Sequence, residues 1–328
     1  MRPPALDLQP QRPYPAPMIE RSNLSLLGVC LFVALCLGCG GKSSDASSGQ
    51  GVKTLSFGSD ETLDLLTWNI ESFPKDEARS PAYVVDTLRM LKPDVVAIQE
   101  VWSQAHLEWV ATTLGSYRVE VVRGDEATGL AFLYNEDTVT LVSPAQTILR
   151  QVAYDFANRP PIQLDIEFRG NRLRLLNLHY KCCGDDVLGG DYWDEEVRRL
   201  RASGSLKGYL DRLPTSDAVI VLGDWNDNLT DPEGINVFQP FLSQPELYHF
   251  VDLELAQNDN PESWSFPSYP SHLDHILINR PLFDAFGKTT SKVATLRVED
   301  SLPNGFWELY TYLSDHRPVG LSLDLGTP

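Results

Sequence analysis

The chain has 328 residues, 42% hydrophobic and 22% charged, which excludes disorder throughout and allows a sizeable buried core. No repeat with a period of about 20 to 50 residues indicates a solenoid or a propeller. The formal net charge of -18, from 27 basic and 45 acidic residues, excludes a broad basic surface for nucleic acid. A polyanionic substrate would therefore need a divalent cation as an intermediary.

Targeting signals occupy the start of the chain. Residues 24–38, LSLLGVCLFVALCLG, form an apolar run that is shorter than a membrane span of about 20 residues and precedes Cys39. The sequence LCLGCGG resembles a bacterial lipoprotein signal that would place lipid on Cys39, and an ordinary secretory signal is the alternative. We predict a leader and signal peptide over 1–39 and a flexible Ser/Gly-rich tether over 40–59. Either signal exports the protein, to the bacterial cell envelope as an outer-membrane lipoprotein or as a secreted protein.

After the tether, short runs rich in Val, Ile and Leu alternate with amphipathic segments. The spacing of apolar residues predicts helices at 81–92 and 194–213. Residues 117–179 have the pattern of consecutive strands, with the hairpin signal RGN at 169–171. Other predicted strands contain, in chain order, LDLLTWNIE, PDVVAIQEVW, AVIVLGDWND, HLDHILIN and YLSDHRPVGLSLDL. This mixture indicates an α+β fold of two packed sheets with helices outside.

Most of these strands end or begin at a polar residue that can take part in catalysis. Any one such residue is ordinary, because polar residues often close strands. Their repetition on separate strands is informative, since strand ends can meet at one edge of a fold. The residues are Asn69, Glu71, Glu100, His179, Asp224, Asn226, Asp274, Asp315 and His316.

Adjacent cysteines follow one of these strand ends. Cys182 and Cys183 are the cysteines that remain after the predicted signal, and they lie in the sequence HYKCCGDD. In an oxidising compartment they can form a strained vicinal disulfide, and a soft-metal site is the weaker alternative. We predict the disulfide, as a stiffener of the loop after His179.

The ordered motifs TWNIE, AIQEVW, LNLHYK, LGDWND, SHLDHILI and LSDHRP resemble those of the endonuclease/exonuclease/phosphatase superfamily. This superfamily includes deoxyribonuclease I, neutral sphingomyelinases, inositol polyphosphate 5-phosphatases and abasic-site endonucleases. The resemblance covers about residues 60–326. It implies a four-layer αββα sandwich, with two mostly antiparallel sheets, and a divalent-metal site that cleaves phosphoester bonds.

The resemblance also implies a role for each motif residue. Metal-site residues would be Asn69, Glu71, Glu100 as the direct ligand, and Asp315. Catalytic residues would be His179, Asp224, Asn226, Asp274 and His316. His179 matches the second histidine of deoxyribonuclease I and the sphingomyelinases, although the acidic residue that orients it there has no clear counterpart here. Glu126 is the nearest candidate in the sequence.

These residue types suit phosphodiester hydrolysis. Mg²⁺, with Mn²⁺ or Ca²⁺ as alternatives, takes oxygen ligands from one or two carboxylates and leaves positions for water and phosphate. Asp224 can accept the proton of the attacking water, and Asn226, two residues along an extended chain, should point to the same side. Asp274 can hold His316 in one tautomer and raise its pKa.

We expect a monomeric, metal-dependent phosphodiesterase that acts on extracellular DNA or RNA. A sphingomyelinase-type phospholipase is an alternative, because the aromatic segment NGFWELYTYL could contact a membrane. The sequence also leaves open an inositol-phosphate phosphatase and a catalytically silent surface-binding protein. Arg198 and Arg199 are predicted on a solvated helical face, with contact to a phosphate as the alternative, and His275 should point away from Asp274.

Overall fold

The structure is a computed structural model that describes residues 54–125 and 128–326. The predicted signal peptide, Cys39 and most of the tether lie outside the described residues, as does Glu126. Phe57 is 8% exposed and belongs to the hydrophobic core, so the packed fold includes this residue of the segment predicted as tether.

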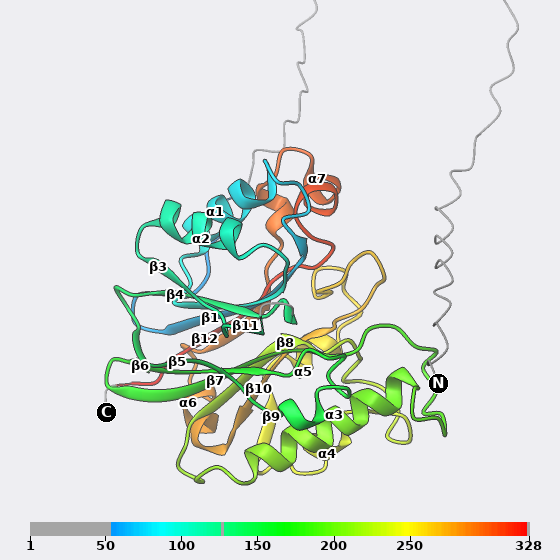
Figure 1. Cartoon of the computed structure of the whole chain (residues 1–328). Helices are drawn as coiled ribbons and strands as arrows, with labels where there is room; N and C mark the ends of the chain where they lie inside the picture. The colour runs from blue at the N-terminus through cyan, green and yellow to red at the C-terminus, as the bar shows by residue number, and fades with distance from the viewer. Residues whose placement is uncertain (1–53, 126–127, 327–328) are drawn as a thin grey trace, which may run out of the picture. The chain divides into compact units, whose positions relative to one another are not determined.

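Two six-stranded sheets form the centre of the fold and pack face to face (Figure 1). In spatial order, the first sheet contains β11 (Lys292–Thr295), β12 (Val319–Leu323), β1 (Leu63–Phe73), β2 (Val95–Val101), β4 (Ala131–Asn135) and β3 (Tyr117–Glu120). The second contains β5 (Thr140–Thr147), β6 (Ile162–Phe168), β7 (Asn171–His179), β8 (Val219–Asp224), β10 (Asp274–Asn279) and β9 (Tyr248–Phe250).

Helices cover the outer faces of both sheets. In Figure 1, α1 and α2 lie beyond the first sheet, and α3 and α4 lie beyond the second. The helices are α1 (Ser80–Leu91), α2 (Gln104–Leu114), α3 (Glu195–Leu210), α4 (Gln239–Leu242), α5 (Leu253–Ala256), α6 (Phe283–Phe286) and α7 (Gly305–Tyr312). Short 3-10 helices are η2 (Arg150–Val152), η3 (Arg280–Leu282) and η4 (Val298–Ser301). The predicted four-layer sandwich is confirmed.

Each sheet has one parallel pair at its centre, and its other neighbouring strands are antiparallel. The parallel pairs are β1 with β2 and β7 with β8. Parallel strands end at the same edge of their sheet. This topology places the ends of β1 and β2 together in one sheet and the ends of β7 and β8 together in the other.

Three hydrophobic cores separate the four layers. The core between the sheets includes Phe132, Leu164 and Ile276, each completely buried, and a side chain of this size contributes about 1.5–3 kcal/mol on burial. The other two cores lie between each sheet and its helices. A polar contact also joins the sheets, because Asn177 donates to the carbonyl oxygens of Ile98 (2.9 Å) and Ala131 (2.8 Å).

Local signals in the sequence explain two of the element boundaries. At the β6–β7 hairpin Arg169 and Gly170 both have positive φ (48° and 83°), as a two-residue type I′ turn requires, which confirms the hairpin prediction. Helix α3 begins after Asp194, whose carboxylate accepts from the Val197 N–H at 2.8 Å and also favours the positive end of the helix dipole.

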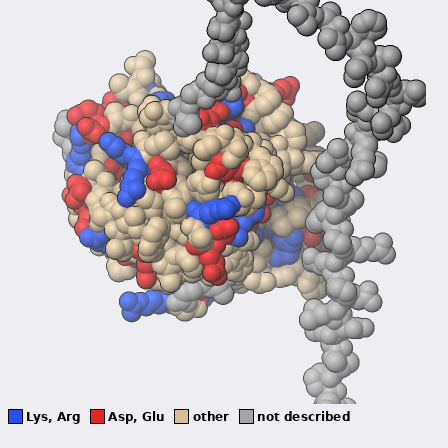
Figure 2. Space-filling model, turned by 90° about the horizontal axis from the view of Figure 1, so that it is seen from above, with Lys and Arg blue, Asp and Glu red and all other residues tan. Residues whose placement is uncertain are grey.

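Some elements differ from the predictions. Helix α2 and strands β9 and β11 were not predicted, and β12 begins at Val319, so Asp315 and His316 lie in the loop before it. None of the helices in residues 54–125 and 128–326 combines the length and apolar composition needed to cross a bilayer. On the face that carries α1, α2 and α7, acidic and basic side chains are interspersed, and no broad basic area is visible (Figure 2).

Candidate active site

Residues from both sheets meet where the central parallel strands end. Asn69 and Glu100 come from β1 and β2, and His179 and Asp224 come from β7 and β8. Gly223 allows this close approach, because a Cβ atom there would lie 2.4 Å from the carbonyl oxygen of Leu178 on the neighbouring strand. The structure therefore brings together the strand-end residues that the sequence predicted.

Asp224 is the central residue of this cluster. Its Oδ2 accepts a hydrogen bond from the amide of Asn69 at 2.9 Å and lies 3.4 Å from Nε2 of His179. Nε2 of His316 is 3.9 Å from the same oxygen. Burial raises the pKa of Asp224 to about 7, because desolvation disfavours the charged carboxylate. Such a group can take up a proton near neutral pH.

His316 is held by Asp274. Its Nδ1 donates to Oδ2 of Asp274 at 2.7 Å, and the ring of Phe266 packs against the imidazole with centroids 4.7 Å apart. Burial alone would lower the pKa of His316, but the charges of Asp274 and Asp224 outweigh it and raise the pKa to about 10. The imidazole therefore favours its protonated form in this protein, as the sequence predicted for this pair.

Four acidic or amide side chains predicted to hold a metal lie beside this cluster. Asn69 also donates to Oε1 of Glu100 at 3.2 Å, and Oε2 of Glu100 accepts from the backbone of Ser72. Oε2 of Glu71 accepts from the Asp315 N–H at 3.0 Å and also pairs with Lys75. Burial and the negative charge of Asp315 raise the pKa of Glu71.

These side chains suit a hard divalent cation, because they offer carboxylate and amide oxygens. The carboxylate oxygens of Glu71, Glu100 and Asp315 are not among the groups of described ligand atoms that lie within 4.8 Å of one another. Among the described residues, groups of three ligand atoms within 4.8 Å of one another occur at Asp224, Asp274 and His316, at Asp252, His272 and His275, and at Asp185, Asp194 and Glu196. A looser set still fits Mg²⁺, which uses one or two protein carboxylates and keeps several waters. Glu100, partly exposed, would be the direct ligand.

Backbone conformations that non-glycine residues rarely adopt cluster here. Positive φ occurs at Glu71 (33°), Ser72 (53°), Glu100 (62°) and Asn226 (53°). Each such residue costs on the order of 1–3 kcal/mol and persists only where the surroundings hold it. Their concentration around the cluster is typical of a functional site.

Asn226 is near Asp224 for a different reason than the one predicted. The alternation of an extended chain does not apply, because β8 ends at Asp224 and Asn226 is left-handed. Instead, the Asn226 N–H donates to Oδ1 of Asp224 at 3.0 Å, and its amide reaches the carbonyl oxygen of Tyr180 at 3.3 Å. The prediction of proximity was right and its reason was wrong.

His179 lies in the cluster without an orienting acid among the described residues. Its Nδ1 is buried and has no hydrogen-bond partner there. Burial lowers the pKa of His179 well below its ordinary value, and the positive charges of Arg159 and His316 add to this shift. A neutral His179 therefore faces Asp224. Glu126, the candidate partner in the sequence, lies outside the described residues.

Arg159 is a site residue that the sequence analysis missed. It donates from Nη2 to the Tyr180 carbonyl oxygen at 2.7 Å, while its buried Nε has no partner among the described residues. Burial lowers the pKa of Arg159, and the negative charges of Asp224 and Glu100 oppose this shift. An unused donor beside these acids can bind a phosphoryl oxygen. The sequence contained one signal for this arginine, which is its position just before the predicted strand that forms β6.

The predicted solvated helical face at Arg198 and Arg199 is wrong. Both side chains are buried, with 8% and 2% exposure. Arg199 binds Asp227 at 2.7 Å and donates to the carbonyl oxygens of Lys181 and Cys183. It therefore ties the loop after β7 to the loop after β8, which carries Asn226.

The two adjacent cysteines are not bonded to each other in this structure. Cys182 and Cys183 are free, exposed thiols whose sulfur atoms lie 3.0 Å apart. The structure thus does not contain the predicted disulfide. Adjacent Cα atoms lie about 3.8 Å apart across a trans peptide, below the usual separation for disulfide-bonded residues. The loop is held by the hydrogen bonds of Arg199 instead.

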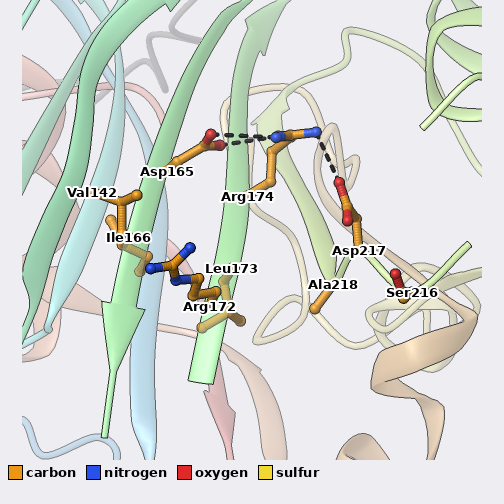
Figure 3. A pocket seen from close by; sticks show the side chains of 9 residues that line it. All are labelled: Val142, Asp165, Ile166, Arg172, Leu173, Arg174, Ser216, Asp217 and Ala218. Carbon is orange, nitrogen blue, oxygen red and sulfur yellow. Dashed lines mark hydrogen bonds and ion pairs between the residues drawn. The ribbon is translucent and has the colours of Figure 1, made fainter. Parts of the chain in front are cut away.

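A surface hollow of about 260 Å³ lies away from this site (Figure 3). Arg174 crosses it and pairs with Asp165 at 3.0 Å and Asp217 at 3.1 Å, so its charge is already neutralised. On β7, Arg174 precedes His179 by about 17 Å of extended strand. The hollow is lined by Val142, Asp165, Ile166, Arg172, Leu173, Arg174, Ser216, Asp217 and Ala218. It has no contact with the acid–histidine cluster.

An αββα sandwich with acids and histidines at one edge of its central strands defines a class of phosphoesterase fold. The model of the Endonuclease/Exonuclease/phosphatase family matches residues 66–316, and the chain belongs to this family. Enzymes of the family are hydrolases that depend on divalent metals, and the chain has acidic and histidine groups that can bind one. A comparison with curated protein sequences gives no significant match.

Solved structures share the fold at low sequence identity. D. rerio TDP2 complexed with a single-strand DNA product is 19% identical with a TM-score of 0.57, and the match covers 80% of this chain and 99% of that one. The human Nocturnin catalytic domain with bound sulfate is 15% identical with a TM-score of 0.56, covering 81% and 96%. Mannosyl-6-phosphatase of Bacteroides thetaiotaomicron is 15% identical with a TM-score of 0.53, covering 80% and 99%.

Proposed function

We propose that this protein is an exported, divalent-metal-dependent phosphodiesterase that cleaves extracellular DNA or RNA. The observation that carries the proposal is the shared carboxylate of Asp224, which contacts Asn69 and lies within 3.4 Å of His179 and 3.9 Å of His316. Unlike a fully hydrogen-bonded structural cluster, this one keeps buried polar atoms without a partner among the described residues, at Nδ1 of His179 and Oδ1 of Asp274. Family membership supports a phosphoester substrate.

Each residue around Asp224 has a different role in the proposed hydrolysis. Asp224 accepts the proton of the attacking water, and its raised pKa of about 7 matches a base that works near neutral pH. Asn226 and Arg159 bind phosphoryl oxygens and orient the phosphate. His316, kept protonated by Asp274, donates a proton or a hydrogen bond to the leaving oxygen. Neutral His179 stabilises the developing charge as a donor.

Glu100, with Asn69, Glu71 and Asp315 nearby, would hold the cation. Once bound, the cation would neutralise phosphoryl charge and favour ionisation of water, and Mg²⁺ is the ion that this oxygen set suits best. The raised pKa of Glu71, caused by burial and by Asp315, supports a site that gains stability from added positive charge. The same argument explains how a protein with a net charge of -18 can bind a polyanion.

Nucleic acid is the favoured substrate, and anchoring by lipid on Cys39 is part of the proposal. The similar structure of D. rerio TDP2 is described with a single-strand DNA product, which supports a nucleic acid substrate for this fold. The predicted signal at 24–38 supports export. We propose that the enzyme acts as a monomer, tethered to the cell envelope or released from it.

The test is hydrolysis by the full chain of plasmid DNA, RNA, sphingomyelin, inositol phosphates and mannose 6-phosphate, with Mg²⁺ and with a chelator. We expect release only from nucleic acid and only with metal. An Asp224→Asn variant should be inactive and controls for a contaminating nuclease. Release from sphingomyelin or from a phosphomonoester alone would contradict the nuclease proposal. Turnover of none of these substrates would favour a catalytically silent binding protein.

A further inference from the structure

An exposed group of aromatic rings lies on the loop that joins β7 to α3. Tyr192 and Trp193 are 54% and 68% exposed. Tyr192 stacks on Tyr154 with ring centroids 4.9 Å apart and an angle of 9° between the planes. Trp193 meets both tyrosines edge-on, with its centroid 5.7 Å from Tyr154 and 5.5 Å from Tyr192. The three rings support one another and hold Trp193 toward solvent.

Two arginines of α3 pack on these rings. The guanidinium of Arg198 lies 4.1 Å from the ring centroid of Tyr154, and that of Arg201 lies 4.2 Å from the ring centroid of Tyr192. Arg201 is neutralised, because it also pairs with Asp155. Arg198 donates to the carbonyl oxygen of Tyr154 at 2.6 Å and pairs with no carboxylate among the described residues. The positive charge of Arg198 is therefore left without a negative partner.

Such an arginine is unusual in this acidic chain. Six arginines in the described part of the chain lack an ion pair with a carboxylate, and four of them are exposed to solvent, namely Arg79, Arg123, Arg212 and Arg280. Arg198, 8% exposed, and Arg159, partly buried, are the remaining two. Removing a guanidinium from water without an anion is unfavourable. Two such groups in one region indicate a place where a ligand supplies the negative charge.

The aromatic group adjoins the candidate active site. Tyr154 and Arg159 belong to the same loop before β6, and the charges of Asp224, Glu100 and Arg198 all act on Arg159. Arg199, next to Arg198 on α3, binds Asp227 in the loop after β8. Helix α3 therefore connects the rings to the site through two neighbouring arginines.

We propose that Tyr192, Trp193 and Arg198 form a subsite for one nucleotide of a single-stranded nucleic acid, beside the phosphate that is cleaved. This inference rests on the proposed nuclease function. The exposed face of Trp193 stacks on the base, and Arg198 binds an adjoining phosphate. Aromatic stacking together with cationic backbone contacts is how proteins bind single strands.

The requirement for a single strand follows from the stacking. In a duplex the faces of the bases are covered by their neighbours, so a protein ring has no base to stack on. A lipid surface fits less well, because Tyr192 and Trp193 stand beside two arginines and not in a wide apolar area. A sugar phosphate could stack on the same ring, and the experiment separates it from a nucleotide.

The test is binding of fluorescently labelled strands to the full chain, measured by anisotropy with Mg²⁺ present. An Asp224→Asn background suppresses cleavage during the measurement. The probes are a single-stranded DNA of about 12 nucleotides, an abasic strand of the same length and a duplex. We expect the base-containing strand to bind about tenfold more tightly than the abasic strand. Trp193→Ala should remove this difference, and Trp109→Ala, at a 50% exposed tryptophan on α2, should keep it.

Arg198→Met tests the phosphate contact. The slope of log affinity against log salt concentration should fall by about 0.7 when one contact to single-stranded phosphate is lost. Arg212→Met, at an exposed arginine, should leave the slope unchanged. Circular dichroism checks that each variant is folded, and Arg198→Lys, which keeps the charge, should restore the slope if Arg198→Met is unfolded.

The outcomes separate this inference from the proposed function. If the wild-type chain cleaves nucleic acid but Trp193→Ala binds both strands as its parent does, the subsite is wrong and the nuclease proposal stands. If the wild-type chain neither binds nor cleaves nucleic acid, the nuclease proposal fails first. A higher KM for mannose 6-phosphate in Trp193→Ala, with no effect on oligonucleotides, would also overturn the nucleotide subsite.

Discussion

Strand β10 carries two acid–histidine clusters on its two faces, and they differ in how completely they are hydrogen-bonded. Asp274 points toward the candidate active site and binds His316 at 2.7 Å. The next residue, His275, points away and binds Asp252 at 2.6 Å. Both clusters are buried, and both contain groups that could bind a metal.

The cluster around Asp252 is fully satisfied. His275 donates from Nε2 to the Asp227 carbonyl oxygen at 3.0 Å, and His272 donates from Nδ1 to the Ser263 carbonyl oxygen at 2.8 Å. The remaining nitrogen of each ring faces Oδ2 of Asp252. The other carboxylate oxygen of Asp252, Oδ1, accepts from the Ile276 N–H. No ring nitrogen is left for a ligand. The group acts as a scaffold that ties together the loops around β10.

The cluster around Asp274 has unused capacity. Oδ1 of Asp274 is buried and has no partner among the described residues, and Nε2 of His316 has carboxylates of Asp224 and Asp315 only at 3.9 Å. Arg159 and His179 nearby also have one buried nitrogen each that no described residue contacts by a hydrogen bond. Both clusters are buried and contain acids and histidines, and unsatisfied hydrogen-bonding capacity among the described residues is what distinguishes the candidate active site.

The largest effect on activity is expected from the loss of His316. His316→Gln should lower kcat/KM by a factor of about 10² to 10⁴, because an acid or donor at the leaving oxygen is lost. Its free energy of unfolding should fall by about 1–3 kcal/mol, because Asp274 loses its charged partner while the glutamine amide can still donate to it. Steady-state kinetics and urea unfolding measure the two quantities. Near-normal turnover would remove His316 from the mechanism.

The opposite pattern is expected at the scaffold cluster. Asp252→Asn should lower the free energy of unfolding by about 3–5 kcal/mol, because it leaves buried imidazoles without their carboxylate. The folded fraction should retain catalysis. Urea unfolding, with activity normalised to the folded fraction, measures both. A stable but inactive variant would show that the Asp252 cluster takes part in the reaction.

Arg159 should give an intermediate effect. Arg159→Met should lower kcat/KM by about 10- to 100-fold, because a hydrogen bond to a charged group contributes about 1.5–3 kcal/mol. Arg150→Met is a matched control, since that arginine is exposed and pairs with Asp125. Kinetics on the same nucleic acid substrate give the comparison. Equal rates for the two variants would show that Arg159 does not contact the phosphate.

The pH dependence of stability separates the clusters further. Burial alone would lower the pKa of His275, but the charge of Asp252 outweighs burial and raises this pKa above 6.5. The stability that protonated His275 contributes is therefore present below pH 6.5 and is lost as the pH rises through the raised pKa. The pKa of Asp252 is lowered by its histidines, so its contribution is present above 3.8 and is lost as pH falls. The difference in free energy of unfolding between wild type and Asp252→Asn should be largest between pH 3.8 and pH 6.5. Urea unfolding across pH would show a flat difference if the pair does not titrate as described.

The smallest effect is expected at the cysteines. Cys182→Ser and Cys183→Ser should each change kcat/KM by less than about twofold, because the exposed thiols form no bond to site side chains and Arg199 holds the loop through carbonyl oxygens. Kinetics with and without a reducing agent make the check. A large loss on reduction would restore the vicinal disulfide as a stiffener of this loop.

Local patterns in the sequence predicted most of the central elements, and the resemblance of the ordered motifs to the superfamily predicted the roles of the site residues. Alternating and helical apolar spacing predicted β1, β2, β7, β8, α1 and α3, because such patterns reflect which face of an element is buried. Polar residues at the strand ends, together with the resemblance of their motifs to the superfamily, predicted the cluster around Asp224. These features depend on short stretches of chain and on a small number of ways to pack two sheets.

Only the tertiary structure decided which polar residues are satisfied and which are free. Arg198 and Arg199 had the spacing of a solvated helical face, yet loops distant in sequence bury them. His275 and Asp274 are neighbours in sequence, and their partners Asp252 and His316 come from different segments. Hydrogen bonds between distant segments depend on the packing of the whole domain, so no local pattern reveals them. The same packing distinguishes the candidate active site from the fully hydrogen-bonded Asp252 cluster.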